Sequence, residues 1–264
     1  MDFTFFIKNF QVLLLVFMRI TGMFVVAPFF SSFLIPVRTK IILAIFISFI
    51  IYPVLTKFNP SIPSHMINYG LLIVEQLLIG IILGFISSII FTAFQMAGQF
   101  FSFQMGFGIN QVYDPLSQIQ IPIIGQLQYL IAIMVFLVIG GDRLLLNALY
   151  KSFEILPLLD FSNIIKVKFL AKSLSKIFSS MFLLALEISF PVLATMFLVS
   201  LIMGLLAKAS PQMNLFMVGF SFQIGIGLIA LIIIMPYLID IMNHVIKVMY
   251  NDLIRFIYGI SIAK

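Results

Sequence analysis

The most constraining feature of this sequence is a run of 66 residues, 76–141, in which Asp114 is the only charged side chain. Its flanks are almost wholly apolar, whereas its centre, Phe94–Gly125, carries seven Gln and Asn side chains together with glycine and proline. Glycine frees the backbone, and proline removes a hydrogen-bond donor and disfavours helix before it. The run therefore predicts two long apolar helices joined by an irregular, amide-rich loop.

The composition places the chain among membrane proteins. Of its 264 residues, 62% are hydrophobic and only 9% are charged, whereas a soluble domain has about 25% charged residues. A bilayer span needs roughly 20 apolar residues, so five or six spans fit and no soluble domain is left over. We expect one integral-membrane domain over residues 1–264.

Apolar periodicity and turn residues predict an all-α membrane protein of about six long, partly broken hydrophobic helices arranged in hairpins. The expected segments are Phe10–Phe30, Ile41–Thr56, Ile67–Phe103, Ile123–Ile139, Met181–Ala207 and Leu215–Met235, with a final amphipathic helix at Tyr237–Tyr258. As one helix the third segment would be ~55 Å long, well beyond a hydrocarbon core of about 30 Å. It must either break or extend past the bilayer.

The basic residues predict an orientation. Lys and Arg number 11 on the N-terminus, second loop, fourth loop and C-terminus, and 3 on the other loops, which places both termini in the cytoplasm for six spans. Lys168, Lys172 and Lys176 lie four residues apart, opposite an apolar stripe. This pattern is typical of a basic amphipathic helix on an anionic leaflet, and equally of a solvated helix face.

Two features inside the predicted spans have two readings each. Arg19 is costly at membrane depth, so it either snorkels to the interface or pairs inside an assembly. Gly80 and Gly84 form a GxxxG pattern, which allows close helix approach but also occurs by chance.

The central loop also has two readings. Irregular backbone at membrane depth is tolerated where protein buries it or where it lines a wet cavity, which favours a loop in or beside a pore. A loop on the membrane surface fits the same spacing.

The sequence offers few suitable residues for two other classes of function. Glu75, Asp114 and Glu187 are candidate ion sites of a secondary transporter, but they lie in separate segments without a broken-helix repeat to gather them. An enzyme or a metal site would have only His65 and His244, no cysteine and no paired carboxylates at ligand spacing. We expect no catalytic residue, no metal and no cofactor.

Several motifs in order resemble the FliR family of flagellar type III export proteins. The resemblance covers nearly the whole length and rests on Arg19-Ile-Thr-Gly22, Ala27-Pro28, Pro36-x-Arg38, Glu75, Gly80, Gly84, Gly98, Gln104-Met105-Gly106, Asp114-Pro115, Pro122, Gly140-Gly141, Pro211-Gln212-Met213-Asn214-x-Phe216 and Gly219-Phe220. Asp142 stands where the family often has His. The related injectisome export proteins are the alternative, and the Asp-Pro loop with Pro-Gln-Met-Asn favours the flagellar branch.

The resemblance implies a non-enzymatic subunit of the flagellar protein export gate in the bacterial inner (cytoplasmic) membrane, at the flagellar basal body. Such a chain looks like a fusion of a FliP-like and a FliQ-like element and joins FliP-like and FliQ-like subunits in a pore-forming core. A FlhB-like switch protein packs outside that core. Unfolded flagellar proteins would pass through it, with lipid and no nucleic acid as further partners.

The expected site residues fall into two groups. The resemblance makes the central loop a plug inside the channel, and its expected plug or gate residues are Met105, Gly106, Phe107, Gly108, Ile109, Asp114, Pro115 and Pro122. The expected assembly and structural residues are Arg19, Glu75, Gly80, Gly84, Pro211, Gln212, Met213 and Asn214.

The chemistry of individual residues refines these expectations. Met105 and Phe107 are the expected seal, because methionine adapts its shape and the flanking glycines let the backbone move. Asp114 either holds the plug through hydrogen bonds or a salt bridge, or makes a local turn before Pro115. Residues 208–214 predict a tight hairpin turn whose amides cap helices or contact partners.

Overall fold

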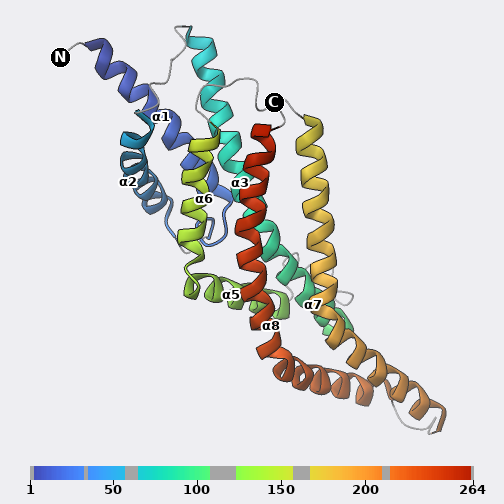
Figure 1. The fold of residues 1–264 in the computed structure, drawn as a ribbon. Helices are drawn as coiled ribbons and strands as arrows, with labels where there is room; N and C mark the ends of the chain where they lie inside the picture. The colour runs from blue at the N-terminus through green and yellow to red at the C-terminus, as the bar shows by residue number, and fades with distance from the viewer. Residues whose placement is uncertain are drawn as a thin grey trace. The chain divides into compact units, whose positions relative to one another are not determined.

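The computed structural model describes residues 3–32, 35–56, 65–107, 123–156, 167–209 and 215–262. Apart from short turns this part of the chain is helical and has no strand, so the all-α prediction is confirmed (Figure 1). The helices are α1 (Phe3–Val26), α2 (Val37–Thr56), α3 (Met66–Gln104), α5 (Ile123–Val138), α6 (Gly141–Ile155), α7 (Val167–Ala209) and α8 (Leu215–Ile262).

The longest helices are more continuous than the sequence predicts. α3 runs unbroken for 39 residues. The basic segment and the fifth span form the single helix α7, and the sixth span and the final amphipathic helix form the single helix α8. Separate helices at these two places were a wrong prediction. No proline stands at the expected junction in α7 near Met181, and α8 continues through Pro236 because the remaining backbone bonds of a long apolar helix hold it together.

The chain is a multi-pass membrane protein. Within the described ranges, four helices contain stretches long and apolar enough to cross a bilayer: Asn9–Val26, Met66–Gln104, Ala171–Ala209 and Gly219–Ile260. α5 and α6 form a fifth candidate as a pair, bent by 72° at a short break. Gly140 lies at this break with a φ of 75°, a left-handed conformation that suits glycine.

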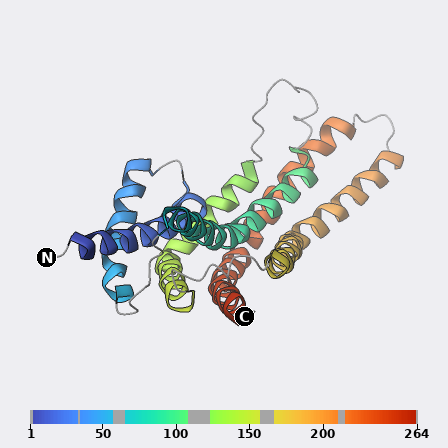
Figure 2. The ribbon, with the colours of Figure 1, turned by 90° about the horizontal axis from the view of Figure 1, so that it is seen from above.

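The described helices divide into two compact units. Unit 1 comprises residues 1–89, 140–178 and 246–264, and unit 2 comprises residues 90–139 and 179–245. In unit 1, α2 packs on α1, and α1 crosses α3 (Figure 2). The end of α8 lies beside α6, where the Tyr250 hydroxyl donates to the Asn147 side-chain oxygen at 2.9 Å (Figure 1).

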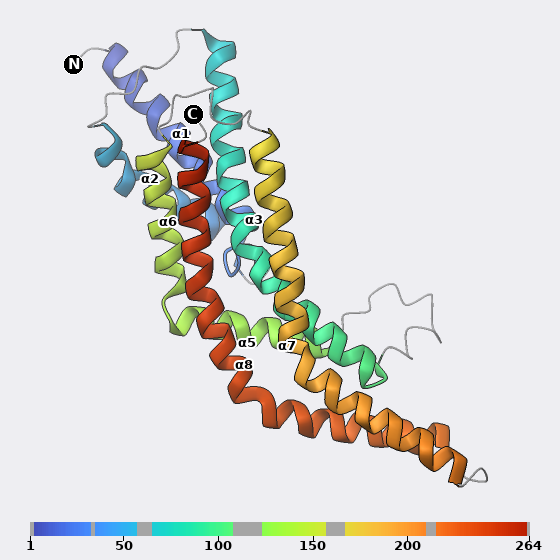
Figure 3. The same ribbon diagram turned by 45° about the vertical axis from the view of Figure 1, so that its right-hand side comes forward.

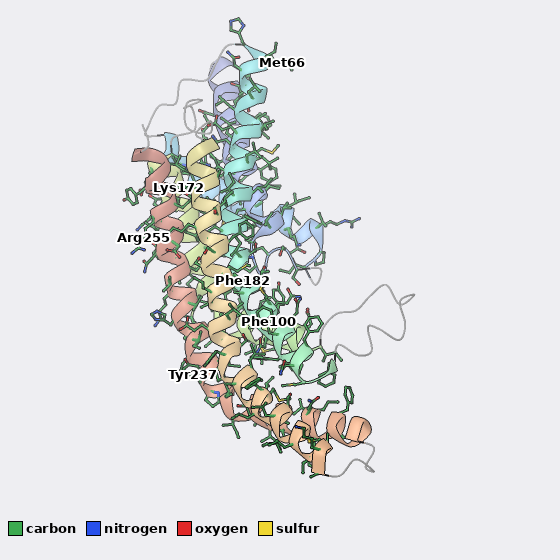
Figure 4. All side chains as sticks on the ribbon, turned by 90° about the vertical axis from the view of Figure 1, so that its right-hand side faces the viewer. Met66, Phe100, Lys172, Phe182, Tyr237 and Arg255 are labelled. Carbon is green, nitrogen blue, oxygen red and sulfur yellow. The ribbon has the colours of Figure 1, made fainter. Side chains whose placement is uncertain are left out.

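Unit 2 is built around the second half of α3. Gly98 of α3 touches the Gly125 backbone of α5, so no side chain separates these helices at that point. Phe91 packs against the rings of Tyr129 and Phe136 along the same pair. α7 and α8 run antiparallel as a hairpin (Figure 3), in which Gln223 donates to the Ser200 hydroxyl at 3.4 Å. Phe100 of α3 meets Phe182 of α7 edge to face (Figure 4).

Candidate functional site

A buried polar cluster surrounds Arg19 in unit 1. The guanidinium is fully buried, and all three of its nitrogens donate hydrogen bonds. Nε donates to Gln76 Oε1 at 2.7 Å, and Nη1 donates to the carbonyl oxygen and hydroxyl of Ser152 at 2.9 and 3.2 Å. Nη2 donates to the Leu156 carbonyl oxygen at 3.1 Å. A cation inside an apolar protein is tolerated because it is bonded on every side.

These bonds make Arg19 a cap for the C-terminal end of α6. The last carbonyls of a helix have no partner within the helix and carry the negative end of its dipole. Arg19 binds the carbonyl of Leu156 and also that of Ser152, which already accepts the Leu156 N–H at 3.0 Å, and it lies over the Phe153 ring at 4.3 Å. A residue of the first helix thus holds the end of a helix that lies more than 130 positions away in the chain.

The structure decides between the readings of Arg19. Its side chain is fully buried, which excludes snorkelling, and the hydrogen-bond partners described here lie in the same chain. Glu75, beside Gln76 on α3, is also buried, at 6% exposed. Sequence reasoning named Arg19 and Glu75 but missed Gln76 and Ser152, since nothing local marks a residue that acts as a distant acceptor.

Close helix contacts bring Arg19 to this place. A side chain on Gly80 would collide with the Arg19 carbonyl oxygen, and one on Gly84 would come within 2.7 Å of the Met23 carbonyl oxygen. In the same way, a side chain on Gly22 of α1 would collide with the Leu77 carbonyl oxygen of α3. The GxxxG of α3 therefore lies directly on α1, and backbone approaches backbone as in small-residue crossings of membrane helices.

A second candidate site lies where α3 ends in unit 2. Met105 follows the last residue of α3, and its side chain is fully buried. Gly106 has a φ of 88°, and its N–H donates to the Phe103 carbonyl oxygen at 3.1 Å. This is the left-handed glycine that commonly terminates a helix. Phe107 is half-buried.

α8 receives this helix end. A side-chain carbon on Gly227 would lie 2.5 Å from Met105 Cγ and 3.0 Å from both Met105 Cε and Sδ. A side-chain carbon on Gly106 would lie 2.6 Å from Cε2 of Phe220. Sequence reasoning included Phe220 and Gly227 only as parts of a motif and a span, because a notch for a distant side chain appears only in three dimensions.

The remaining expected residues lie outside the described part of the chain. These are Gly108, Ile109, Asp114, Pro115 and Pro122 of the expected plug, and Pro211, Gln212, Met213 and Asn214 of the hairpin turn. The plug and seal roles of Met105 and Phe107, and the assembly roles of the second group, stay predictions.

The transporter hypothesis finds no gathered set of acids in the described residues. Glu75 is buried in unit 1, Glu187 is an exposed residue of unit 2, and Asp114 lies outside the described residues. In the same part of the chain no three His, Cys, Asp or Glu side chains are grouped as metal ligands.

Basic side chains mark one face of unit 1. Lys172 and Lys176 are exposed on α7, while Met181 farther along the apolar stripe is buried. Arg255 is exposed on α8, on the same part of the molecule as Lys172 (Figure 4). Its guanidinium pairs with Asp252 at 3.8 Å, a solvent-exposed contact worth little.

Comparison with known proteins gives matches over most of the chain. Residues 10–249 match the family described as bacterial export proteins, family 1. The flagellar biosynthetic protein FliR of Bacillus subtilis (strain 168) is 37% identical over 240 residues, which cover 90% of this chain and 92% of that protein. FliR of Escherichia coli (strain K12) is 30% identical over 234 residues, or 89% and 88% of the two chains.

A further FliR, from Aquifex aeolicus (strain VF5), is 30% identical over 233 residues, which cover 88% of both chains. The matches run through both compact units and include the Arg19 cluster and the end of α3. The chain therefore belongs to the FliR family of flagellar biosynthetic proteins, within the bacterial export proteins of family 1.

Proposed function

We propose that this chain is a non-enzymatic subunit of the flagellar type III protein export gate in the bacterial inner membrane. In this role it helps to form, and in the resting state to plug, the channel through which unfolded flagellar proteins cross. The observation that carries the proposal is the family match over residues 10–249, together with 37% identity to a FliR over nearly the whole length of both chains.

The exposed apolar surface of α7 and α8 supports a place inside a larger assembly. Only 17% of the apolar stretch of α7 and 22% of that of α8 are buried within the chain, against 44% for α1 and 56% for α3. Large side chains such as Phe190, Phe197 and Ile233 are therefore left for lipid or other subunits to cover. FliP-like and FliQ-like subunits, with a FlhB-like protein outside them, are the proposed neighbours.

The position of residues 108–122 in the chain supports a plug that is anchored at both ends. They connect α3 to α5, and these two helices touch at Gly98 and Gly125. The segment thus leaves and returns to helices in direct contact. Its single charge and many amides would allow it to close a channel without binding ions tightly.

Removal of part of the plug tests the proposed function. Deleting residues 109–118 in cells that produce the whole complex should shift the channel toward its open state, because a closed state loses the contacts that favour it. Membrane conductance and small-solute swelling should then rise, while affinity purification still recovers the partner subunits.

If the deletion variant yields a normally recovered complex and the membrane does not leak, the deleted segment is not the principal seal. The purified chain alone serves as the control against a transporter. Reconstituted without partners, it should give no solute flux, and autonomous flux would contradict the role of a channel subunit.

A further inference from the structure

We propose that Met105 and Gly227 form a latch, in which a side chain at the end of α3 sits in a glycine notch on α8. We further propose that this latch holds the point from which the plug segment departs. Gly227 and Phe220 are then positioning residues for the plug. The consequence for gating rests on the proposed function, whereas the latch itself rests on the contacts within unit 2.

A side chain at Gly227 would meet Met105, whereas one at its near neighbour Gly225 would meet no other residue. Three consecutive side-chain atoms of Met105, from Cγ through Sδ to Cε, lie where a side chain at position 227 would begin. Gly225, two residues earlier, is exposed and has nothing within 4 Å of the same position. The notch therefore serves Met105, and a general need for glycine in this helix does not explain it.

A second contact lies two helical turns away on the same face of α8. Phe220 precedes Gly227 by seven residues, which places both on one side of a helix with 3.6 residues per turn. Its ring covers the backbone of Gly106, which adopts the left-handed conformation that ends α3. The two contacts grip consecutive residues, Met105 and Gly106, and so fix both the end of the helix and the direction of the chain after it.

Methionine suits such a latch. Its unbranched thioether fills an irregular space and can leave it without breaking a hydrogen bond. Full burial makes the seated position favourable, since a buried methionine contributes strongly to the state that buries it. Released from the notch, α3 would end without its anchor on α8. The latch thus biases the start of the plug toward one position.

Cysteine pairs test the geometry directly, because the chain has no cysteine of its own. Met105→Cys with Gly227→Cys should form a disulfide on mild oxidation of membranes that contain the assembled complex. The bond should appear as a loss of maleimide-polyethylene glycol labelling that a reductant reverses. The matched control combines Met105→Cys with Gly225→Cys and should keep its labelling. Equal labelling of the two pairs after oxidation would overturn the latch.

A size exchange tests whether the latch holds the plug. Gly227→Leu should evict Met105 and raise small-solute entry, whereas Gly225→Leu should stay near the unmodified chain. Adding Met105→Ala to Gly227→Leu empties the space that leucine needs and should restore the tight membrane. If Gly227→Leu instead prevents recovery of the complex, the same second change should restore recovery.

The outcomes separate the latch from the proposed function. Failure of Met105→Ala to rescue either leakage or recovery would contradict the latch. Suppose that the disulfide forms and that Met105→Ala restores recovery of the Gly227→Leu complex, but that neither Gly227→Leu nor deletion of residues 109–118 makes the membrane leak. The latch between Met105 and Gly227 is then supported, and the plug is contradicted.

Discussion

A single arginine ties three helices of unit 1 together. Arg19 of α1 reaches Gln76 of α3 and the carbonyls at the end of α6. Its planar fork matters, because separate nitrogens point at separate acceptors, and a lysine ammonium cannot reach them all. Removing the donor would leave the buried Leu156 carbonyl without its Arg19 hydrogen bond, at a cost of about 1–3 kcal/mol.

Substitution of this residue should therefore destabilise the protein even when the charge is kept. Arg19→Lys should lower the unfolding temperature of the detergent-solubilised complex, and Arg19→Met should lower it further, because it loses every donor. Fluorescence-detected size exclusion after heating measures both. Arg38→Lys, on an exposed residue, is the matched control and should change little. Equal shifts for Arg19→Lys and Arg38→Lys would contradict the role of the fork.

At the scale of elements, glycines allow helices to meet backbone to backbone. α1 lies on α3 at Gly80 and Gly84, and α5 lies on α3 at Gly98 and Gly125. In lipid there is little hydrophobic gain from pairing helices, so close packing over small residues supplies much of the attraction. One helix, α3, thus takes part in both units through different glycines.

Two glycines of α3 should respond in opposite directions to the same substitution. Gly80→Ala puts a methyl group into the Arg19 carbonyl and should lower thermal stability and recovery of the complex. Gly70→Ala meets nothing within 4 Å and should raise stability by about 0.5–1 kcal/mol, because alanine favours helix more than glycine. The same heating assay compares them. An increase in stability for both would mean that α1 and α3 do not need this close contact.

At the scale of the whole molecule, the number of spans decides the topology. Four spanning helices, or six, place the two ends of the chain on the same side of the membrane, whereas five place them on opposite sides. The described helices support four, or five if the bent α5–α6 pair crosses. The distribution of basic residues favours cytoplasmic ends.

We therefore expect both ends in the cytoplasm. A green fluorescent protein should fluoresce when fused to either end, and an alkaline phosphatase should stay inactive at both, because it folds only outside the cytoplasm. Fusions at Ala209, between α7 and α8, should give the reverse pattern as the internal control. Active phosphatase at one end of the chain alone would indicate five spans.

The sequence is sufficient to assign the class of the protein, because apolar composition and helical periodicity act locally and need no partner. It was enough to predict an all-α membrane protein, the two helices around the amide-rich segment, and the glycines of α3. It did not determine where helices join: the predicted junctions near Met181 in α7 and at Pro236 in α8 are absent, because no helix breaker stands near Met181 and one missing backbone bond does not end the long helix at Pro236.

What the individual residues contact depends on how the helices pack. Arg19 finds its acceptors on helices that are 57 and 133 positions away, and Met105 finds its notch on α8. Such contacts depend on how close two backbones come and on which faces meet. No local pattern encodes these distances, so the acceptors Gln76 and Ser152 and the notch at Gly227 become visible only when the helices are packed.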